Sequence, residues 1–226
     1  MSTDELVRPE SKAETTTGSG IRWRQFGGML AVTGVLTAGL VTLTAQGVLA
    51  ANFSISGMPF TVAATHLHGD GFEQFATIDS MIEDSPNAEQ PGPDGQTGGQ
   101  RVVIVSAIDK AELTNLCQSV SLGGSFLKIT AGDNKTPVKA DSLVVDSISI
   151  NGDTDFKNID IGQDASTVDK VIDRRGGGGH VVGGPGVFSQ QADTVDIDSL
   201  RQTNYATTAS RFTLPHLRMS FTRNDC

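Results

Sequence analysis

Apolar side chains recur at every second position through most of the chain beyond residue 50, and this spacing is the feature that most constrains its fold. It is seen in Phe53-Ser54-Ile55, Ile148-Ser149-Ile150 and Val195-Asp196-Ile197. Side chains two residues apart lie on one face of a strand, whereas a helix needs a period of about 3.6 residues, which no window sustains. Glycine and aspartate fill the gaps between the apolar runs, and both are typical of turns. The sequence therefore predicts an all-β fold.

The strands are expected to belong to one domain. We predict about ten to twelve strands in a single twisted β-sandwich or barrel-like domain, with an irregular β-solenoid as the alternative. Asn151-Gly152 predicts a hairpin turn, since this dipeptide suits a tight two-residue loop. Residues 113–119 (LTNLCQS) resemble residues 197–203 (IDSLRQT), which predicts a duplicated hairpin. No fixed period runs along the chain, as a regular solenoid would require.

The charge of the chain lies in its C-terminal part. Residues 1–50 hold four basic and four acidic side chains, so all of the net charge of -9 belongs to residues 51–226. A nucleic-acid binder needs a basic face to neutralise phosphates, and no run of Lys or Arg longer than Arg174-Arg175 occurs. We therefore expect no nucleic-acid partner.

The N-terminal segment predicts the compartment. No ionisable side chain occurs between Arg24 and His66, and residues 27–50 would make an apolar helix about 36 Å long, enough for a hydrocarbon core of about 30 Å. Arg22 and Arg24 precede it, a charge bias that keeps the N-terminus cytoplasmic. We therefore predict a cytosolic n-region at residues 1–24, a signal peptide or membrane anchor at residues 25–50, and an extracytoplasmic β domain at residues 51–226.

Two outcomes stay open for the apolar segment. Small residues ending at Ala50 fit a signal-peptidase site, which predicts a secreted protein. Trp23, at the position of an interfacial aromatic, fits an uncleaved anchor, which would make the membrane a partner and hold the β domain at its extracytoplasmic face. Both surroundings are oxidising, so Cys117 and Cys226, the only cysteines, are predicted to form a disulfide.

The metal candidates are His66, His68 and Asp70. Histidines two residues apart on a strand project from one face and can share a zinc ion, with an aspartate nearby. The stretch partly resembles the T-H-x-H-x-D-H motif of metallo-β-lactamase-type hydrolases, but Gly71 stands where that motif has its last histidine. Two histidines on an exposed strand end are the alternative. The oxygen-rich residues 151–160 make calcium a second candidate, although no cofactor is required by the sequence.

No catalytic residue can be assigned from a motif. The sequence contains no G-x-S-x-G nucleophile elbow. A Ser-His pair built from distant segments is compatible with the sequence, because such sites are defined by geometry rather than by order along the chain. Nothing ranks the serines and histidines against one another, so the catalytic residues stay unknown at this stage.

Three stretches carry a family resemblance: residues 115–120 (NLCQSV), residues 188–214 (FSQQADTVDIDSLRQTNYATTASRFTL) and Asp225-Cys226. With these residues the chain resembles an exported, Streptomyces-type actinobacterial family of unknown function whose members often carry the name cholesterol esterase. The resemblance implies a protein that acts on lipids as a sterol (cholesteryl) ester hydrolase. A non-catalytic cell-envelope protein, either structural or lipid-binding, is the alternative that the residues alone favour.

Overall fold

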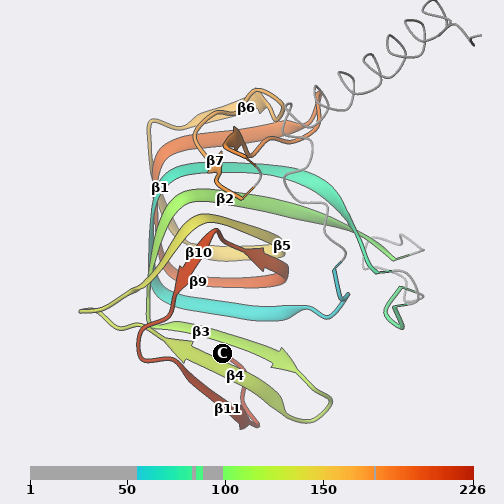
Figure 1. Ribbon diagram of the computed structural model, residues 1–226, viewed down its shortest axis with the longest axis vertical. Helices are drawn as coiled ribbons and strands as arrows, with labels where there is room; N and C mark the ends of the chain where they lie inside the picture. Colours follow the sequence, from blue (N-terminus) through green and yellow to red (C-terminus); the bar gives the residue numbers. More distant parts are fainter. Residues whose placement is uncertain (1–54, 83–84, 89–98, 176) are drawn as a thin grey trace, which may run out of the picture. The chain divides into compact units, whose positions relative to one another are not determined.

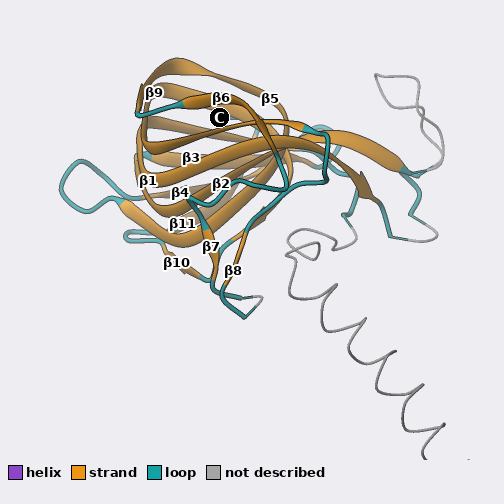
Figure 2. Ribbon diagram, turned by 90° about the horizontal axis from the view of Figure 1, so that it is seen from above, coloured by secondary structure: helices purple, strands orange, loops and turns teal. Residues whose placement is uncertain are grey.

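The computed structural model describes residues 55–82, 85–88, 99–175 and 177–226, and Figures 1 and 2 show only strands and loops there. The eleven strands are β1 (Phe60–Ser80), β2 (Gln100–Thr114), β3 (Leu116–Ser121), β4 (Phe126–Ala131), β5 (Val138–Lys157), β6 (Asp160–Asp164), β7 (Ile172–Asp173), β8 (Gly179–His180), β9 (Phe188–Thr208), β10 (Arg211–Thr213) and β11 (Arg218–Thr222). The all-β prediction is confirmed. The predicted n-region (1–24) and apolar segment (25–50) lie outside the described residues, among which no helix is long and apolar enough to cross a membrane.

One large antiparallel sheet contains nine of the strands, in the order β11-β4-β3-β1-β2-β5-β9-β6 with β10 paired to β5. Strand β1 pairs with β2 on one side and with β9 on the other, and β5 pairs with both β2 and β9. Because these pairings lead back to β1, the sheet curls strongly around its inner face (Figure 1). It is barrel-like but not a closed barrel, since β6 and β11 each pair with one neighbour only among the described strands.

Both faces of the curled sheet bury apolar side chains. The inner face holds one cluster, and the outer face holds a second cluster to which the segment 165–187 contributes Ala165, Val171 and Val181. Neighbouring Val144 and Val145 of β5 point to opposite faces and belong to different clusters. This arrangement explains why the middle of β5 is almost continuously buried, as expected for a strand covered on both faces.

The hairpin predicted at Asn151-Gly152 is wrong, because both residues lie inside β5 and face β9. A Cβ atom at position 152 would lie 2.5 Å from Cγ2 of Ile197 and 3.0 Å from the backbone carbonyl oxygen of Asp198. The glycine therefore permits a close approach of two strand backbones, which is the other common role of glycine within a strand. The dipeptide alone does not distinguish this role from a turn.

The internal repeat is a kinked strand and not the predicted duplicated hairpin. Asn115, between β2 and β3, has a φ of 54°, and Ser199, at the equivalent position of the repeat, has a φ of 55° within β9. These left-handed residues interrupt the regular strand geometry while the chain continues in the same direction. Leu116 and Leu200, the next residues, are both buried in the inner cluster.

Strands β3, β4 and β11 form a three-stranded extension of the sheet beyond the end of β2 (Figure 1). The C-terminal tail returns to β3, where Cys226 forms the predicted disulfide with Cys117 at a Cα–Cα distance of 5.8 Å. The backbone N–H of Cys226 also donates to Oγ of Ser119 over 3.1 Å. The end of the chain is thus fixed to β3.

Candidate functional site

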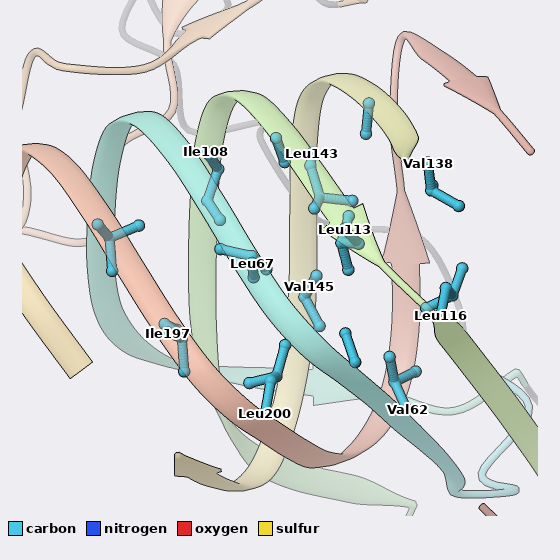
Figure 3. Close-up of a cluster of buried hydrophobic side chains, with 14 of the residues drawn as sticks. Val62, Leu67, Ile108, Leu113, Leu116, Val138, Leu143, Val145, Ile197 and Leu200 are labelled. Carbon is cyan, nitrogen blue, oxygen red and sulfur yellow. The ribbon is translucent and has the colours of Figure 1, made fainter. Parts of the chain in front are cut away.

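The inner face of the sheet surrounds a cavity of about 320 Å³. Protein interiors seldom leave voids much larger than a water molecule, whereas small-molecule sites begin at about 300 Å³. Figure 3 shows inner side chains from β1, β2, β5 and β9 pointing toward one another around this space. The apolar residues that line it are Val62, Leu67, Phe72, Ile104, Ile108, Leu113, Leu116, Leu143, Val145, Ile150, Phe156, Ile197 and Phe212.

Strand β9 adds polar groups to the wall of this cavity. Gln202 and Asn204 alternate along the strand and are 7% and 1% exposed, and Thr207 lies beyond them. The Gln202 Oε1, the Thr207 Oγ1 and both amide atoms of the Asn204 side chain are buried without a hydrogen-bond partner among the described residues. A buried polar atom left unpaired costs about 1–3 kcal/mol. Strand β9 thus brings to this wall polar atoms that have no partner within the described part of the chain.

A second polar group on the wall is internally satisfied. The Gln190 Nε2 donates to Gln74 Oε1 over 2.7 Å, and the Gln74 Nε2 donates to Ser106 Oγ over 2.8 Å. This chain links β9, β1 and β2 across the inner face. It differs from Gln202 and Asn204 because its members hold one another in place.

The cavity wall contains no ionisable side chain among the described residues that line it. Burial of an ionised group without a partner is strongly unfavourable, so this wall suits an uncharged molecule better than a carboxylate or an ammonium. A more open hollow of about 390 Å³ shares Gln118, Thr207 and Phe212 with the cavity. Phe212, which is 40% exposed, lies where the cavity and this hollow meet.

Sequence reasoning named none of these cavity residues as a site, although one signal was present. The internal repeat pairs Leu116 with Leu200 and Gln118 with Gln202. Both leucines belong to the inner cluster and both glutamines line the cavity. The repeat therefore marks two equivalent positions on the cavity wall.

The predicted metal residues lie on the outer face of β1, away from the cavity wall. His66 Nδ1 is 2.8 Å from Oδ1 of Asp198, and His68 Nδ1 is 2.7 Å from Oδ1 of Asp196. Asp70 lies 3.7 Å from His68 Nε2. Asp196 Oδ1 also lies 3.6 Å from His66 Nε2, so the two histidines share this aspartate of β9. Within the part of the chain that the structure describes, no group of three or more His, Cys, Asp or Glu side chains is placed to hold a metal ion. Zinc and calcium stay predictions.

Three buried carboxyl groups lie away from the cavity wall. Glu73 is 0% exposed, its Oε1 accepts the backbone N–H of Val171 over 2.7 Å, and burial raises its pKa to about 8. Burial raises the pKa of Asp79 to about 6, and burial together with the charge of Asp79 raises the pKa of Asp146 to about 7. Through its hydrogen bond with the N–H of Val171, Glu73 helps to hold the segment 165–187 on the outer face.

Comparison with known proteins identifies the family. A model of the family of unknown function DUF6230 matches residues 56–226, so the chain belongs to this family. The curated proteins and the solved structures gave no match. The matched residues contain all eleven described strands and both cysteines of the disulfide. Because the family has no known function, a functional conclusion depends on the cavity.

Proposed function

We propose that this DUF6230 protein binds one uncharged, largely apolar molecule, such as a lipid or a sterol, inside its curled sheet. The observation that carries the proposal is the apolar cavity of about 320 Å³ with the unpartnered side-chain amide of Asn204 on its wall. Burial of apolar ligand surface would drive binding, by about 0.8 kcal/mol for each buried methylene group. The amides would fix the orientation of the ligand.

The chemistry of the wall narrows the ligand to a neutral one. Gln202 supplies an unpaired acceptor, and Asn204 supplies both a donor and an acceptor. A hydroxyl group can donate to one amide and accept from another, and an ester or amide carbonyl can accept from Asn204. The expected ligand is therefore a lipid with a hydroxyl, ester or amide head, and not an ionised fatty acid.

Hydrolysis of a sterol ester, which the family resemblance implies, stays an untested prediction. Ser106 Oγ already accepts a hydrogen bond from Gln74. A nucleophilic hydroxyl needs an adjacent base, and no histidine or carboxylate is among the described residues on the cavity wall. We therefore favour binding without catalysis as the role of the cavity. A secreted or membrane-held location remains part of the proposal, and the disulfide is compatible with it.

The test is a ligand titration with the full chain. A long-chain alcohol and cholesterol should each bind with one molecule per chain, and the fatty acid of equal length should bind at least about tenfold more weakly at neutral pH. Ser106→Phe places a large side chain on the cavity wall and should abolish binding, whereas Ile161→Phe, at an exposed position of β6, should not.

Two outcomes would contradict the binding proposal. One is equal affinity for all three ligands in the native protein and in the Ser106→Phe variant. The other is release of product from a cholesteryl ester in the same samples, lost in Ser106→Phe and kept in Ile161→Phe, which would make the protein a hydrolase. Retention of the disulfide and of the unfolding transition shows that each variant is folded.

A further inference from the structure

A second space adjoins the cavity of the curled sheet. The more open hollow of about 390 Å³ shares Gln118 of β3, Thr207 of β9 and Phe212 of β10 with the cavity. These three side chains therefore mark the place where the two spaces meet. A molecule too long for the cavity would reach the hollow here.

The hollow lies along an unpaired edge of β9. Strand β1 pairs with β9 only as far as Phe60 and Asn204, whereas β9 continues to Thr208 and stays paired with β5 on its other edge. Residues 205–208 have no strand partner on the edge away from β5, and no other backbone hydrogen bond, within the described part of the chain. All four residues line the hollow. An unpaired strand edge carries both N–H donors and C=O acceptors, so β9 brings both to the hollow.

The side chains of the hollow favour an uncharged partner. No acidic or basic side chain is among the described residues that line it. Gln118 is half-buried, and its amide has no hydrogen-bond partner among the described residues. The Oγ1 atom of Thr207 is buried and unpaired. A group with several hydroxyls suits such a site, because each hydroxyl both donates and accepts, whereas an ionised group would have no counter-charge there.

The unpaired polar groups of the cavity lie at the end next to the hollow. Val62 of β1 has Gln118 of β3 and Gln202 of β9 as its neighbours on the two adjacent strands. Phe60, which lines the hollow, has Asn204 as its neighbour on β9. The amides of Gln202 and Asn204 are therefore close to the hollow.

Farther along β1 from Phe60, the cavity wall is apolar or internally satisfied. Phe72 of β1 and Phe156 of β5 both line the cavity, with ring centroids 5.3 Å apart. Gln74 and Gln190 already bond with each other. This part of the wall suits a hydrocarbon chain, whose burial is favourable, and offers little to a polar head.

We propose that the hollow is the head-group site for the molecule in the cavity, and that this molecule is a single-chain lipid with an uncharged, hydroxyl-rich head, such as a monoacylglycerol. The chain lies in the cavity toward Phe72 and Phe156, and the head bonds with Gln118 and the open edge of β9. One chain is sufficient, because the hollow shares its residues with one apolar cavity. This inference rests on the proposed function, since it assumes that the cavity binds a lipid.

A comparison of two ligands in the full chain tests the head-group site. Monolauroylglycerol and dodecanol have chains of equal length and differ in the head, so the ratio of their affinities reports on the hollow. Gln118→Leu should lower this ratio about fivefold, as expected for loss of one hydrogen bond to the larger head. The matched control is Gln100→Leu, at an exposed position of β2 outside both spaces, and should leave the ratio unchanged.

A tryptophan reporter tests the orientation of the ligand with Gln118 intact. Trp23 is the only tryptophan, so Trp23→Phe removes the background emission and Phe212→Trp places a reporter where the cavity and the hollow meet. Monoacylglycerol brominated close to its ester should quench this reporter more strongly than monoacylglycerol brominated at the chain end. The control reporter, Phe188→Trp, is at a 64% exposed position outside both spaces and should not be quenched by either ligand.

The outcomes separate failure of this inference from failure of the proposed function. If neither ligand binds the native protein, the proposed function and the head-group site are both wrong. If both ligands bind but Gln118→Leu leaves the affinity ratio unchanged, the hollow does not hold the head. Stronger quenching of the residue 212 reporter by bromine at the chain end would show that the lipid is bound in the reverse orientation, and would overturn the head-group site while lipid binding stands.

Discussion

The two faces of the curled sheet bury apolar side chains in different ways. On the outer face, the segment 165–187 closes over Val103, Val105 and Val144, and its own Val171 and Val181 are 0% exposed. On the inner face, side chains of the same strands surround a cavity of about 320 Å³. The outer face is thus filled by the chain itself, whereas the inner face leaves room for another molecule.

The outer face therefore mainly stabilises the fold, whereas the inner face has room to bind another molecule. Dense packing on the outer face gives dispersion contacts to every side chain, and a hollow inner face forgoes part of them. The hollow face also contains the unpaired atoms of Gln202 and Asn204, which reduce stability unless a ligand pairs with them. Binding sites commonly lower the stability of the protein that contains them in this way.

The largest effect on the free energy of unfolding is expected for Glu73, which holds the segment 165–187 on the outer face. Its raised pKa of about 8 belongs to the folded state, while the ordinary value is 4.5. Between these values the folded protein holds more protons than the unfolded chain, so the free energy of unfolding falls as the pH rises. The slope is up to about 1.4 kcal/mol per pH unit for this group, and Asp79 and Asp146 act in the same direction.

Glu73→Gln should remove this contribution, since the amide oxygen can still accept the N–H of Val171. Denaturant unfolding at a series of pH values from about 5 to 8 measures the slope. The Glu73→Gln variant should be more stable than the native protein at the upper end of this pH range and similar in stability at its lower end. Parallel curves for the two proteins would show that Glu73 does not titrate in this way.

The next largest effect on the free energy of unfolding is expected for truncation of a valine in β5. Val144 and Val145 are adjacent in sequence and lie on opposite faces, so they can be compared directly. Val144→Ala should lower the free energy of unfolding by about 2 kcal/mol, because it leaves a void in a filled core. Val145→Ala should cost about half as much, because its side chain already borders the cavity. Equal losses in denaturant unfolding would mean that the inner face is as tightly packed as the outer one.

Asn204→Leu should affect stability and binding in opposite directions. Removal of the two unpaired amide atoms should raise the free energy of unfolding by about 1 kcal/mol. The same change should weaken binding of a neutral lipid about tenfold, because one hydrogen bond to the ligand is lost. The matched control is Thr203→Val, at the neighbouring position of β9 and not on the cavity wall. Destabilisation by Asn204→Leu would show that the amide supports the fold.

The sequence predicted the strands because alternation is a local property, and it predicted the disulfide because only two cysteines occur. A barrel-like domain was among the predictions, but the pairing that curls the sheet was not, because it joins strands that are distant in the sequence. β9 shows why the cavity was missed: Leu200, Gln202 and Asn204 share one face, and local alternation assigns such polar residues to solvent. Only the return of β9 to β1 turns that face inward.

The smallest effect is expected for the pH dependence of ligand binding. The affinity for a neutral lipid should change by less than about twofold between pH 5 and 8, because binding depends on pH only if it alters the proton affinity of some group. No ionisable side chain is among the described residues on the cavity wall, and Glu73, Asp79 and Asp146 are not on it. Titration of a long-chain alcohol at several pH values tests this under conditions in which the protein stays folded. A steep pH dependence of the binding affinity would show that the segment 165–187 on the outer face and the cavity on the inner face are coupled through the strands they share.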